Sequence, residues 1–338
     1  MNEKSAHINI IPFPRFRLGL FPSPLQEMER LTKELRGPRL FVKRDDLSGF
    51  LLGGNKTRKL EFLIPDIIEK GADIVITTGG VQSNWAAQLA TAARIIKVEV
   101  LLVLWGVEPE NLQGNYLLDK ILRAEIKFVD ISMDEYRQNI TGIMEEIAED
   151  YRKIGKRPYV LPLGGSTPLA NLGWVNGALE LINQANEEDL KIDYVVVAGG
   201  SFGTVSGLAT GFKICNSDVK TICISVLNKN KDDCRSKISS FSQQIVNLMK
   251  LDFQIGEREV DIFVDYVGPR YAERTDASIE AIKLVAQTEG IVLDPVYTGK
   301  VMAGLIDLVK KGFFTRNKNV VFLHTGGAPS LFGYAEYF

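Results

Sequence analysis

Hydrophobic and polar positions along the chain form two kinds of segment. Short apolar runs rich in β-branched residues predict buried strands at residues 73–78, 98–104, 158–161, 194–198, 221–226 and 320–324. Longer segments between them carry apolar residues at three- and four-residue spacing, which is typical of helices packed on a sheet. This alternation predicts an α/β fold in which helices cover parallel sheets.

Most of the predicted strands end in glycine or small polar residues. The clearest examples are Gly79-Gly80, Gly164-Gly165, Gly199-Gly200 and Gly326-Gly327. In open α/β sheets, ligands bind beyond the carboxyl ends of the strands, where such loops gather. The pattern therefore predicts a ligand site at these strand ends.

One predicted helix begins at Lys56, directly after the turn Gly53-Gly54-Asn55. Its apolar positions are Leu60, Leu63, Ile64, Ile67 and Ile68. Pro65 is expected to kink this helix or to end it early, because proline lacks the N–H that a helix needs. The Lys56 amine is either a solvated surface cation, as in most lysines, or a nucleophile that forms an imine with an aldehyde.

Two loops at predicted helix starts have side chains and amides that suit anions. Residues 200–204, Gly-Ser-Phe-Gly-Thr, follow an apolar strand, and their N–H groups and hydroxyls suit a phosphate. The dinucleotide and Walker A patterns do not fit this loop, and a strand-to-helix turn without a ligand is the alternative. In the loop at 79–84, Ser83 and Asn84 either contact a ligand or cap the following helix.

Composition and charge narrow the classes of function. A chain of 338 residues exceeds one ordinary core and predicts about two domains. A net charge of -2 and a pI near 5.9 give no electrostatic reason to expect nucleic acid. Three cysteines and two histidines fit neither a disulfide framework nor a multi-histidine metal site, so no metal is expected. No signal peptide or long apolar run is visible, which favours a cytoplasmic protein without membrane contact.

A lysine for an aldehyde, a loop for a phosphate and a loop for a carboxylate are together the requirements of a pyridoxal phosphate site. The chain resembles the fold-type II, tryptophan synthase beta-like pyridoxal phosphate enzymes of the 1-aminocyclopropane-1-carboxylate deaminase and D-cysteine desulfhydrase family. The motifs that carry the resemblance are Phe13-Pro14-Arg15, Pro24-Leu25, Lys43-Arg44-Asp45-Asp46, residues 53–62, Gln82-Ser83-Asn84, Gly114-Asn115, Leu117-Leu118-Asp119, Gly164-Gly165-Ser166, residues 294–300 and His324-Thr325-Gly326-Gly327.

The resemblance implies a role for each motif. Lys56 is expected to hold the cofactor as a Schiff base and to act in catalysis with Ser83, Tyr271 and Tyr297. The other expected cofactor contacts are Asn84, Gly200, Ser201, Phe202, Gly203, Thr204, Thr298 and Thr325. The expected substrate contacts are Gln82, Ser83, Asn84, Trp85 and Arg270.

The resemblance also implies the domain organisation. Two open, twisted, mostly parallel sheet domains are expected, with the cofactor in the cleft between them. Residues 53–165 are expected to form a small domain inserted into a large one made of residues 1–52 and 166–338. A homodimer that acts on a small amino acid is implied as well.

Two threonines favour one reaction of the family. Members that open the cyclopropane ring have a glutamate after the tyrosine of the Asp-Pro-Val-Tyr motif and an apolar residue before the final Gly-Gly. Thr298 and Thr325 stand there in this chain, as in desulfhydrase-like members. A glutamate near the pyridine nitrogen favours the protonated ring, whereas a hydroxyl tolerates the neutral one. The threonines therefore favour β-elimination, with D-cysteine giving pyruvate, hydrogen sulfide and ammonia.

Departures from the family pattern beside the site leave the substrate open. Trp85 replaces a usual histidine, Phe202 stands where alanine is common, and Arg270 and Arg274 occupy a segment that is usually glycine-rich. The two guanidinium groups either face solvent or pair with an anionic substrate group. L-cysteate sulfo-lyase activity is therefore the main alternative. 1-Aminocyclopropane-1-carboxylate deaminase activity and non-catalytic pyridoxal phosphate binding are the others.

Overall fold

The computed structural model describes residues 12–256 and 259–338. Its strands are β1 (Leu25–Glu27), β2 (Arg39–Arg44), β3 (Ile74–Gly80), β4 (Glu99–Trp105), β5 (Glu125–Val129), β6 (Pro158–Val160), β7 (Tyr194–Gly199), β8 (Lys220–Ser225), β9 (Val260–Phe263) and β10 (Asn319–His324). Its helices are α1 (Glu29–Leu35), α2 (Lys56–Glu69), α3 (Asn84–Ile95), α4 (Gly114–Ile121), α5 (Met133–Lys153), α6 (Pro168–Glu187), α7 (Gly203–Ile214), α8 (Lys231–Leu248), α9 (Asp276–Glu289), α10 (Thr298–Lys310) and α11 (Ala328–Phe332). Short 3-10 turns are η1 (Asp45–Leu47), η2 (Leu163–Gly165) and η4 (Ala335–Tyr337).

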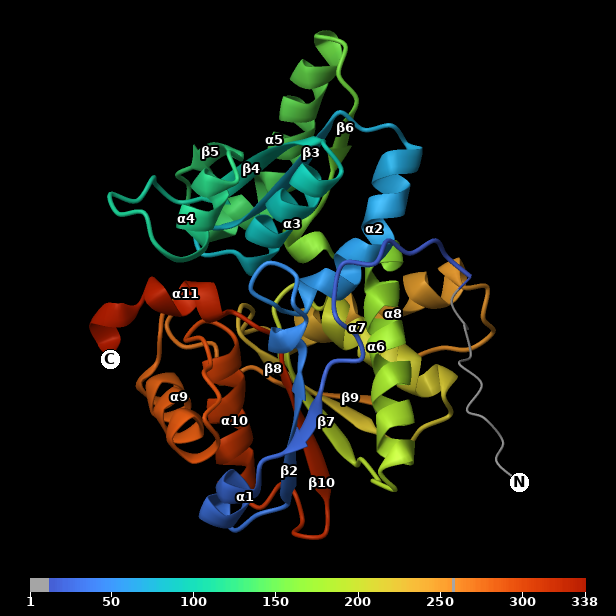
Figure 1. The fold of residues 1–338 in the computed structure, drawn as a ribbon, viewed down its shortest axis with the longest axis vertical. Coiled ribbons are helices and arrows are strands. Elements are labelled where there is room, and N and C mark those ends of the chain that lie inside the picture. The colour runs from blue at the N-terminus through green and yellow to red at the C-terminus, as the bar shows by residue number, and fades with distance from the viewer. Residues whose placement is uncertain (1–11, 257–258) are drawn as a thin grey trace.

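The strands form two sheets (Figure 1). The larger sheet has the order β1-β2-β10-β7-β8-β9, and the smaller has the order β5-β4-β3-β6. Among the pairs of described strands, β1 runs antiparallel to β2 and the others are parallel. The predicted α/β fold with mostly parallel sheets is confirmed. Every apolar run predicted as a strand is one, whereas β1, β2, β5 and β9 were not predicted.

Helices cover both faces of the six-stranded sheet. Figure 1 shows α1, α9 and α10 on one side and α6, α7 and α8 on the other. The first face is packed by Ile282, Met302 and Leu305, which are buried with β2, β7, β8 and β10. The second face is packed by Trp174 and Phe212. Because both faces are covered, the strands carry continuous apolar runs, which is why the sequence reveals them.

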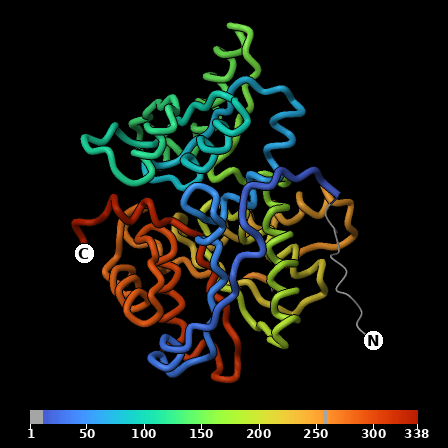
Figure 2. The backbone as a smooth tube through the Cα atoms, viewed as in Figure 1, coloured from blue at the N-terminus to red at the C-terminus, as the bar shows by residue number. Residues whose placement is uncertain are grey.

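The four-stranded sheet is built entirely from residues 74–160 and lies above the larger one in Figures 1 and 2. Helices α2 and α3 pack on one face of it, and α5 packs on the other. Helix α2 also shares a core with α6 of the larger part, through Phe62, Leu172 and Val175. The domain boundaries at residues 53 and 165 stay a prediction.

Pro65 does not end α2 early: the helix continues to Glu69, so that alternative is wrong, and the kink stays a prediction. Proline removes one helical N–H and leaves the Glu61 carbonyl without its usual partner. The amide of Phe16 donates to this carbonyl at 2.8 Å. The buried Glu61 carboxylate also accepts the N–H of Leu18 at 2.9 Å. The N-terminal segment therefore replaces the hydrogen bond that proline cannot make.

Several expectations from composition concern features outside the sheets. No helix of the described residues is long and apolar enough to cross a membrane. Cys215, Cys223 and Cys234 are free thiols, and the described part holds no group of side chains suited to a metal ion. His324 is buried at the end of β10, whereas His7 lies outside the described residues.

Candidate active site

The glycine-rich strand ends of both sheets surround one cavity. Residues expected at the site that line this cavity are Lys56, Ser83, Asn84, Trp85, Gly200, Ser201, Phe202, Thr204, Tyr271, Tyr297 and Thr325. Gly80 and Gly164 of the predicted strand ends and Asn55 of the turn before Lys56 also line it. The lining residues that the sequence analysis did not single out are Trp105, Met133, Tyr136, Arg137, Leu163, Ala198 and Leu227. The fold thus gathers segments from most of the chain around Lys56.

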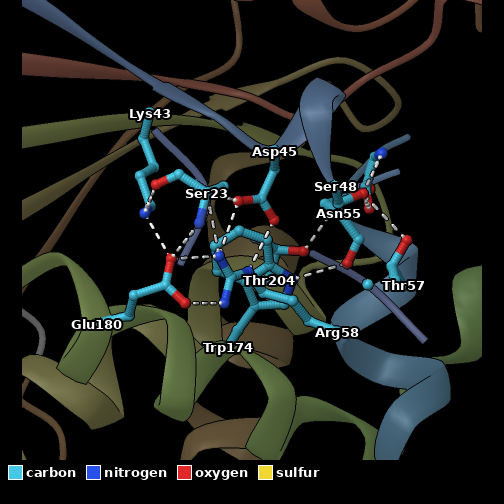
Figure 3. A network of polar contacts seen from close by, with 12 residues as sticks. Ser23, Lys43, Asp45, Ser48, Asn55, Thr57, Arg58, Trp174, Glu180 and Thr204 are labelled. Carbon is cyan, nitrogen blue, oxygen red and sulfur yellow. Dashed lines mark hydrogen bonds and ion pairs between the residues drawn. The ribbon is translucent and has the colours of Figure 1, made fainter. Parts of the chain in front are cut away.

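Lys56 is the first residue of α2, and its side chain faces the cavity. Burial lowers the pKa of the Lys56 amine to about 8, because the low-polarity surroundings disfavour its charged form. The preceding residue, Asn55, donates from its side chain to the Thr204 hydroxyl at 3.0 Å and accepts the Trp174 indole N–H at 3.1 Å (Figure 3). Lys56 is therefore not a solvated surface lysine. The hydrogen bond from Asn55 to Thr204 connects the start of α2 to the loop 200–204.

The loop 200–204 connects β7 to α7 and turns at Phe202, which has φ +63°. A left-handed residue before a helix turns successive N–H groups toward a common point and forms a concave anion site. Bulky residues seldom adopt this conformation. Here the Phe202 ring packs among buried residues such as Val205 and Cys223, which holds the turn in place. The departure from alanine at this position therefore places a side chain in the core and leaves the backbone for the ligand.

A second lysine, Lys59, lies behind this loop and was missed by the sequence analysis. Its Nζ donates to the Gly164 carbonyl at 3.0 Å and to the Ser166 hydroxyl at 2.8 Å. Ser166 donates in turn to the Ser201 hydroxyl at 2.8 Å. Burial, and then the nearby Lys56, lower the pKa of Lys59 well below its ordinary value. The one feature of the sequence that could have indicated a role for Lys59 is its position one helical turn after Lys56, on the same face of α2.

The side chains around the loop 200–204 show whether a phosphate group fits there. A Cβ on Gly203 would lie 2.2 Å from the Asn171 side-chain oxygen and 2.6 Å from the Lys59 Nζ, so only glycine allows this close packing. The buried amide of Asn171 has no hydrogen-bond partner within the described part of the chain. Amide, amine and hydroxyl donors therefore meet at the N-terminus of α7, and this set of groups fits the phosphate of pyridoxal phosphate.

The loop before α3 supplies polar groups to the cavity. The Ser83 hydroxyl caps the helix by accepting the N–H of Ala86 at 3.2 Å. The Asn84 side-chain oxygen accepts from the Asn115 amide at 2.7 Å, which leaves the Asn84 amino group as a donor. The expected substrate contact of Gln82 is not found. Its side-chain oxygen accepts the Asn115 N–H at 2.8 Å, because the first N–H groups of α4 need partners.

Two tyrosines form a hydrogen-bonded pair at the cavity wall. The hydroxyls of Tyr271 and Tyr297 are 2.6 Å apart. Burial raises the pKa of both phenols, so both stay protonated at neutral pH. Tyr334 donates to the Ala272 carbonyl at 2.7 Å and holds the segment that carries Tyr271. The pair can therefore hold and donate a proton beside Lys56.

Thr298, expected at the cofactor, does not line the cavity. Its hydroxyl donates to the Asp294 carboxylate and accepts the Asp294 N–H, each at 2.7 Å. The same carboxylate accepts the N–H groups of Val296, Tyr297 and Thr298 at 2.9 Å. Thr298 therefore closes a cap at the start of α10 that orients Tyr297. Thr325 does line the cavity.

Arg270, predicted to contact the substrate, does not line the cavity of Lys56. Its side chain is 71% exposed and pairs with Glu273, and Arg274 pairs with Asp276. Neither arginine lines the cavity of Lys56, because the local carboxylates hold both at the surface. Trp85 does line the cavity, and its indole N–H donates to the Thr77 hydroxyl at 2.7 Å.

A buried ionic network lies beneath the start of α2 (Figure 3). Arg58 is 1% exposed and donates to Asp45 at 2.8 Å and to Glu180 at 2.8 Å. Lys43 pairs with the same Glu180 at 2.5 Å. Burial alone would raise the pKa of Glu180, but the charges and hydrogen bonds of Arg58 and Lys43 outweigh it and lower the pKa to about 2. The network fixes the helix that begins with Lys56.

Comparison with known proteins agrees with this site. Residues 16–326 match the family model of pyridoxal-phosphate dependent enzymes. The chain is 38% identical over 324 residues to a putative 1-aminocyclopropane-1-carboxylate deaminase of Pyrococcus horikoshii, covering 96% of this chain and 95% of that protein. It is 39% identical over 327 residues to a D-cysteine desulfhydrase of Salmonella typhi, covering 95% and 96%.

Solved structures show the same relationship. A crystal structure of an ACC deaminase homologue has a TM-score of 0.87 and 37% identity, and covers 96% of this chain and 95% of that one. The processed form of threonine deaminase isoform 2 from Solanum lycopersicum has a TM-score of 0.65 at 17% identity, and covers 94% of this chain and 82% of that one. The second structure shares the fold.

Proposed function

The chain belongs to the pyridoxal-phosphate dependent enzymes, and from this membership we propose that it is a β-eliminating lyase of the D-cysteine desulfhydrase type. The observation that carries the proposal is one cavity that joins Lys56, Ser83 and Tyr297 to the loop 200–204. Bound pyridoxal phosphate supplies an aldehyde for a lysine and an electron-withdrawing ring that acidifies the α-hydrogen of an amino acid. The proposed products from D-cysteine are pyruvate, hydrogen sulfide and ammonia.

We assign the cofactor contacts to the residues that line the cavity. The N–H groups of loop 200–204 hold the phosphate, with Lys59 behind them. Asn84 and Thr325, which line the cavity, would contact the ring of the cofactor. The N-terminus of α3, with Ser83 as its cap, receives the substrate carboxylate. Since Thr298 is held by Asp294, the preference for β-elimination over ring opening depends on Thr325.

The proton transfers are assigned to Lys56 and the tyrosine pair. With a pKa of about 8, about a tenth of the Lys56 amine is uncharged at pH 7 and can accept the α-proton. Tyr297 stays protonated and donates to the departing sulfur, while Tyr271 supplies a second proton through their hydrogen bond. The sulfur leaves with the electrons of its bond to the β-carbon.

A substrate screen tests this proposal. Cofactor-loaded protein is incubated with D-cysteine, L-cysteine, L-cysteate, D-serine, β-chloroalanine and 1-aminocyclopropane-1-carboxylate, and keto acid, ammonia and sulfide are measured. Sulfide and pyruvate from D-cysteine are expected. Keto acid from 1-aminocyclopropane-1-carboxylate alone would contradict the proposal, and no turnover of any amino acid would favour a non-catalytic cofactor-binding protein.

The Schiff base has its own test. Lys56→Ala is expected to abolish the visible absorption band of the loaded protein, because its amine is the proposed link to the aldehyde. Lys59→Ala is an unsuitable control, since Lys59 lies at the phosphate loop. Lys70→Ala, at the exposed end of α2, is the matched control. A band that survives in Lys56→Ala excludes the assignment.

The proposal also includes the oligomeric state of the protein and its location in the cell. We propose a homodimer, in which the inserted residues 53–165 form a separate domain of each subunit, working in the cytoplasm. Family membership and the free cysteines support it. Sedimentation tests the assembly: a particle of one 37.6 kDa chain would exclude the dimer.

A further inference from the structure

One basic side chain of the cavity has no part in the proposed chemistry. Among the described residues that line the cavity, Lys56 and Arg137 are basic and none is acidic. In the proposed function the N-terminus of α7 receives the phosphate, and the helix start at Ser83 receives the substrate carboxylate. Arg137, on α5, has no role in the proposed reaction. A guanidinium that faces a cavity without carboxylates favours a further anion.

The guanidinium of Arg137 uses little of its hydrogen-bonding capacity within the protein. Its Nη2 donates to the Leu227 carbonyl at 2.8 Å. Its nearest ion-pair partner, Asp134, lies 4.0 Å away with 88% of its side chain exposed, so the pair is weak. The charge of Arg137 also contributes to lowering the pKa of the Asp233 carboxyl group. Asp233, however, forms its ion pair with Lys237, at 3.0 Å. A guanidinium has five N–H donors in a planar fork, so several remain for an oxyanion.

The neighbours of Arg137 in the cavity are large and their polar atoms are engaged. Tyr136 bonds through its hydroxyl to Thr78, and the indole N–H of Trp105 donates to the Ile131 carbonyl at 2.8 Å. Met133 adds an apolar surface. The Arg137 side chain is 40% exposed, so an anion bound to it keeps part of its contact with solvent. Arg137 is therefore the donor that this wall offers to a ligand.

We infer that Arg137 binds a second anionic group of the substrate, carried on its β-substituent. The substrate class is then an α-amino acid with a sulfonate or carboxylate at that end. This inference rests on the β-elimination of the proposed function, but it names an amino acid with a second anionic group in place of D-cysteine as the substrate. It also replaces Arg270 and Arg274, whose carboxylate partners hold them outside the cavity.

With a sulfonate on the β-carbon, the elimination balances with water as the only other reactant. The α-proton is removed, the carbon–sulfur bond breaks, and its electron pair leaves with the sulfur as sulfite. Water then replaces the nitrogen. One cysteate and one water give one pyruvate, one ammonium and one hydrogen sulfite, and no oxidant is required.

The activity test compares substrates with and without the second anion. In cofactor-loaded protein, kcat/KM is measured for both enantiomers of cysteate and of cysteine. Arg137→Gln is expected to lower kcat/KM for cysteate about 10- to 100-fold more than for cysteine, because a charged hydrogen bond is lost. Arg137→Lys restores part of the loss. Arg152→Gln, an exposed arginine of the same helix, is the control.

A binding test keeps the inference independent of turnover. After borohydride reduction of the loaded protein, Lys56 can no longer exchange with an amino acid. Calorimetry then compares aspartate and cysteate with alanine, so that carboxylate and sulfonate are tested separately. Tighter binding of at least one anionic amino acid, lost in Arg137→Gln, is the expected result.

Two outcomes would overturn the inference. An equal loss for cysteine and cysteate in Arg137→Gln would mean that Arg137 only ties α5 to the Leu227 carbonyl. Loss of the anion preference in Arg270→Gln instead would return the role to that residue. If no amino acid yields keto acid, the proposed function fails, and the binding comparison still decides the role of Arg137.

Discussion

At the scale of single residues, burial distinguishes Lys56 and Lys59 from the surface lysine at the end of the same helix, Lys70. Lys56 and Lys59 both lie within the protein, next to glycine-rich loops. Lys70, on the same helix, is exposed and forms a surface ion pair. Burial disfavours the ammonium form and makes the amine available as a nucleophile or base.

The titration of Lys56 provides one prediction. In cofactor-free protein, the rate of pyridoxal phosphate capture is expected to rise with pH and level off above about 8, because burial lowers the pKa of Lys56 to about 8. The uncharged amine is then about a tenth of the total at pH 7. Stopped-flow absorbance measures the rate. A rate that keeps rising beyond pH 10 would show an unshifted lysine.

Lys59 provides a second prediction. Lys59→Gln keeps a hydrogen-bond donor near Ser166 but removes the amine behind the phosphate loop. The dissociation constant of pyridoxal phosphate is expected to rise about tenfold or more, while the visible band is retained at saturation. Reconstitution titrations measure it against Lys70→Gln. Unchanged affinity would show that Lys59 acts only in packing.

At the scale of elements, helix starts place the chemistry. Lys56 begins α2, Asn84 begins α3, and Tyr297 directly precedes α10. Each start presents free N–H groups that a ligand, a side-chain cap or a neighbouring segment must satisfy. The position of a catalytic side chain therefore depends on how its helix is capped.

The cap of α10 can be tested directly. Asp294→Asn replaces one acceptor oxygen by an amino group, which cannot accept the N–H groups of Val296 and Tyr297. The free energy of unfolding is expected to fall by about 1–3 kcal/mol. Because Tyr297 shifts, kcat should fall more than KM rises. Asp276→Asn, at the exposed start of α9, is the control, and equal effects in both variants would argue against a special cap.

At the scale of the whole molecule, a buried ionic network joins α2, α6 and the strand β2. Glu180 of α6 accepts from Arg58 of α2 and from Lys43 of β2 (Figure 3). Breaking one partner of a buried pair leaves uncompensated charges and is strongly destabilising. The network therefore couples the site of Lys56 to the stability of the fold.

Glu180→Gln is expected to lower the free energy of unfolding at pH 7 by about 3–5 kcal/mol. In the folded protein the pKa of Glu180 is about 2, below its ordinary value of 4.5. Its stabilising contribution is therefore complete above pH 4.5 and is lost as the pH falls toward 2. Urea denaturation at pH 7 and pH 3 measures the difference, with Glu29→Gln as the exposed control. A deficit that does not shrink at low pH would contradict this role.

The predictable part of the fold follows from how its strands are buried. β3, β4, β7, β8 and β10 are covered on both faces, so their apolar runs stand out in the sequence. The unpredicted strands β1 and β5 lie at sheet edges, and buried and exposed residues alternate less clearly along them. The sequence did not show that α2 continues past Pro65, because the amide of Phe16 that bonds to the Glu61 carbonyl comes from a distant segment.

The cofactor could be predicted without the fold, because Lys56, Ser83 and the loop 200–204 lie in short motifs that together resemble those of a known family. Only the folded structure shows which side chains line the cavity together. Folding removed Gln82, Thr298 and Arg270 from the expected set, since their hydrogen-bond partners turn them away, and it added Lys59 and Arg137. The burial and the partners of a side chain depend on segments far away in the chain. An arginine on the polar face of α5 therefore looks like any solvated cation until the fold is known.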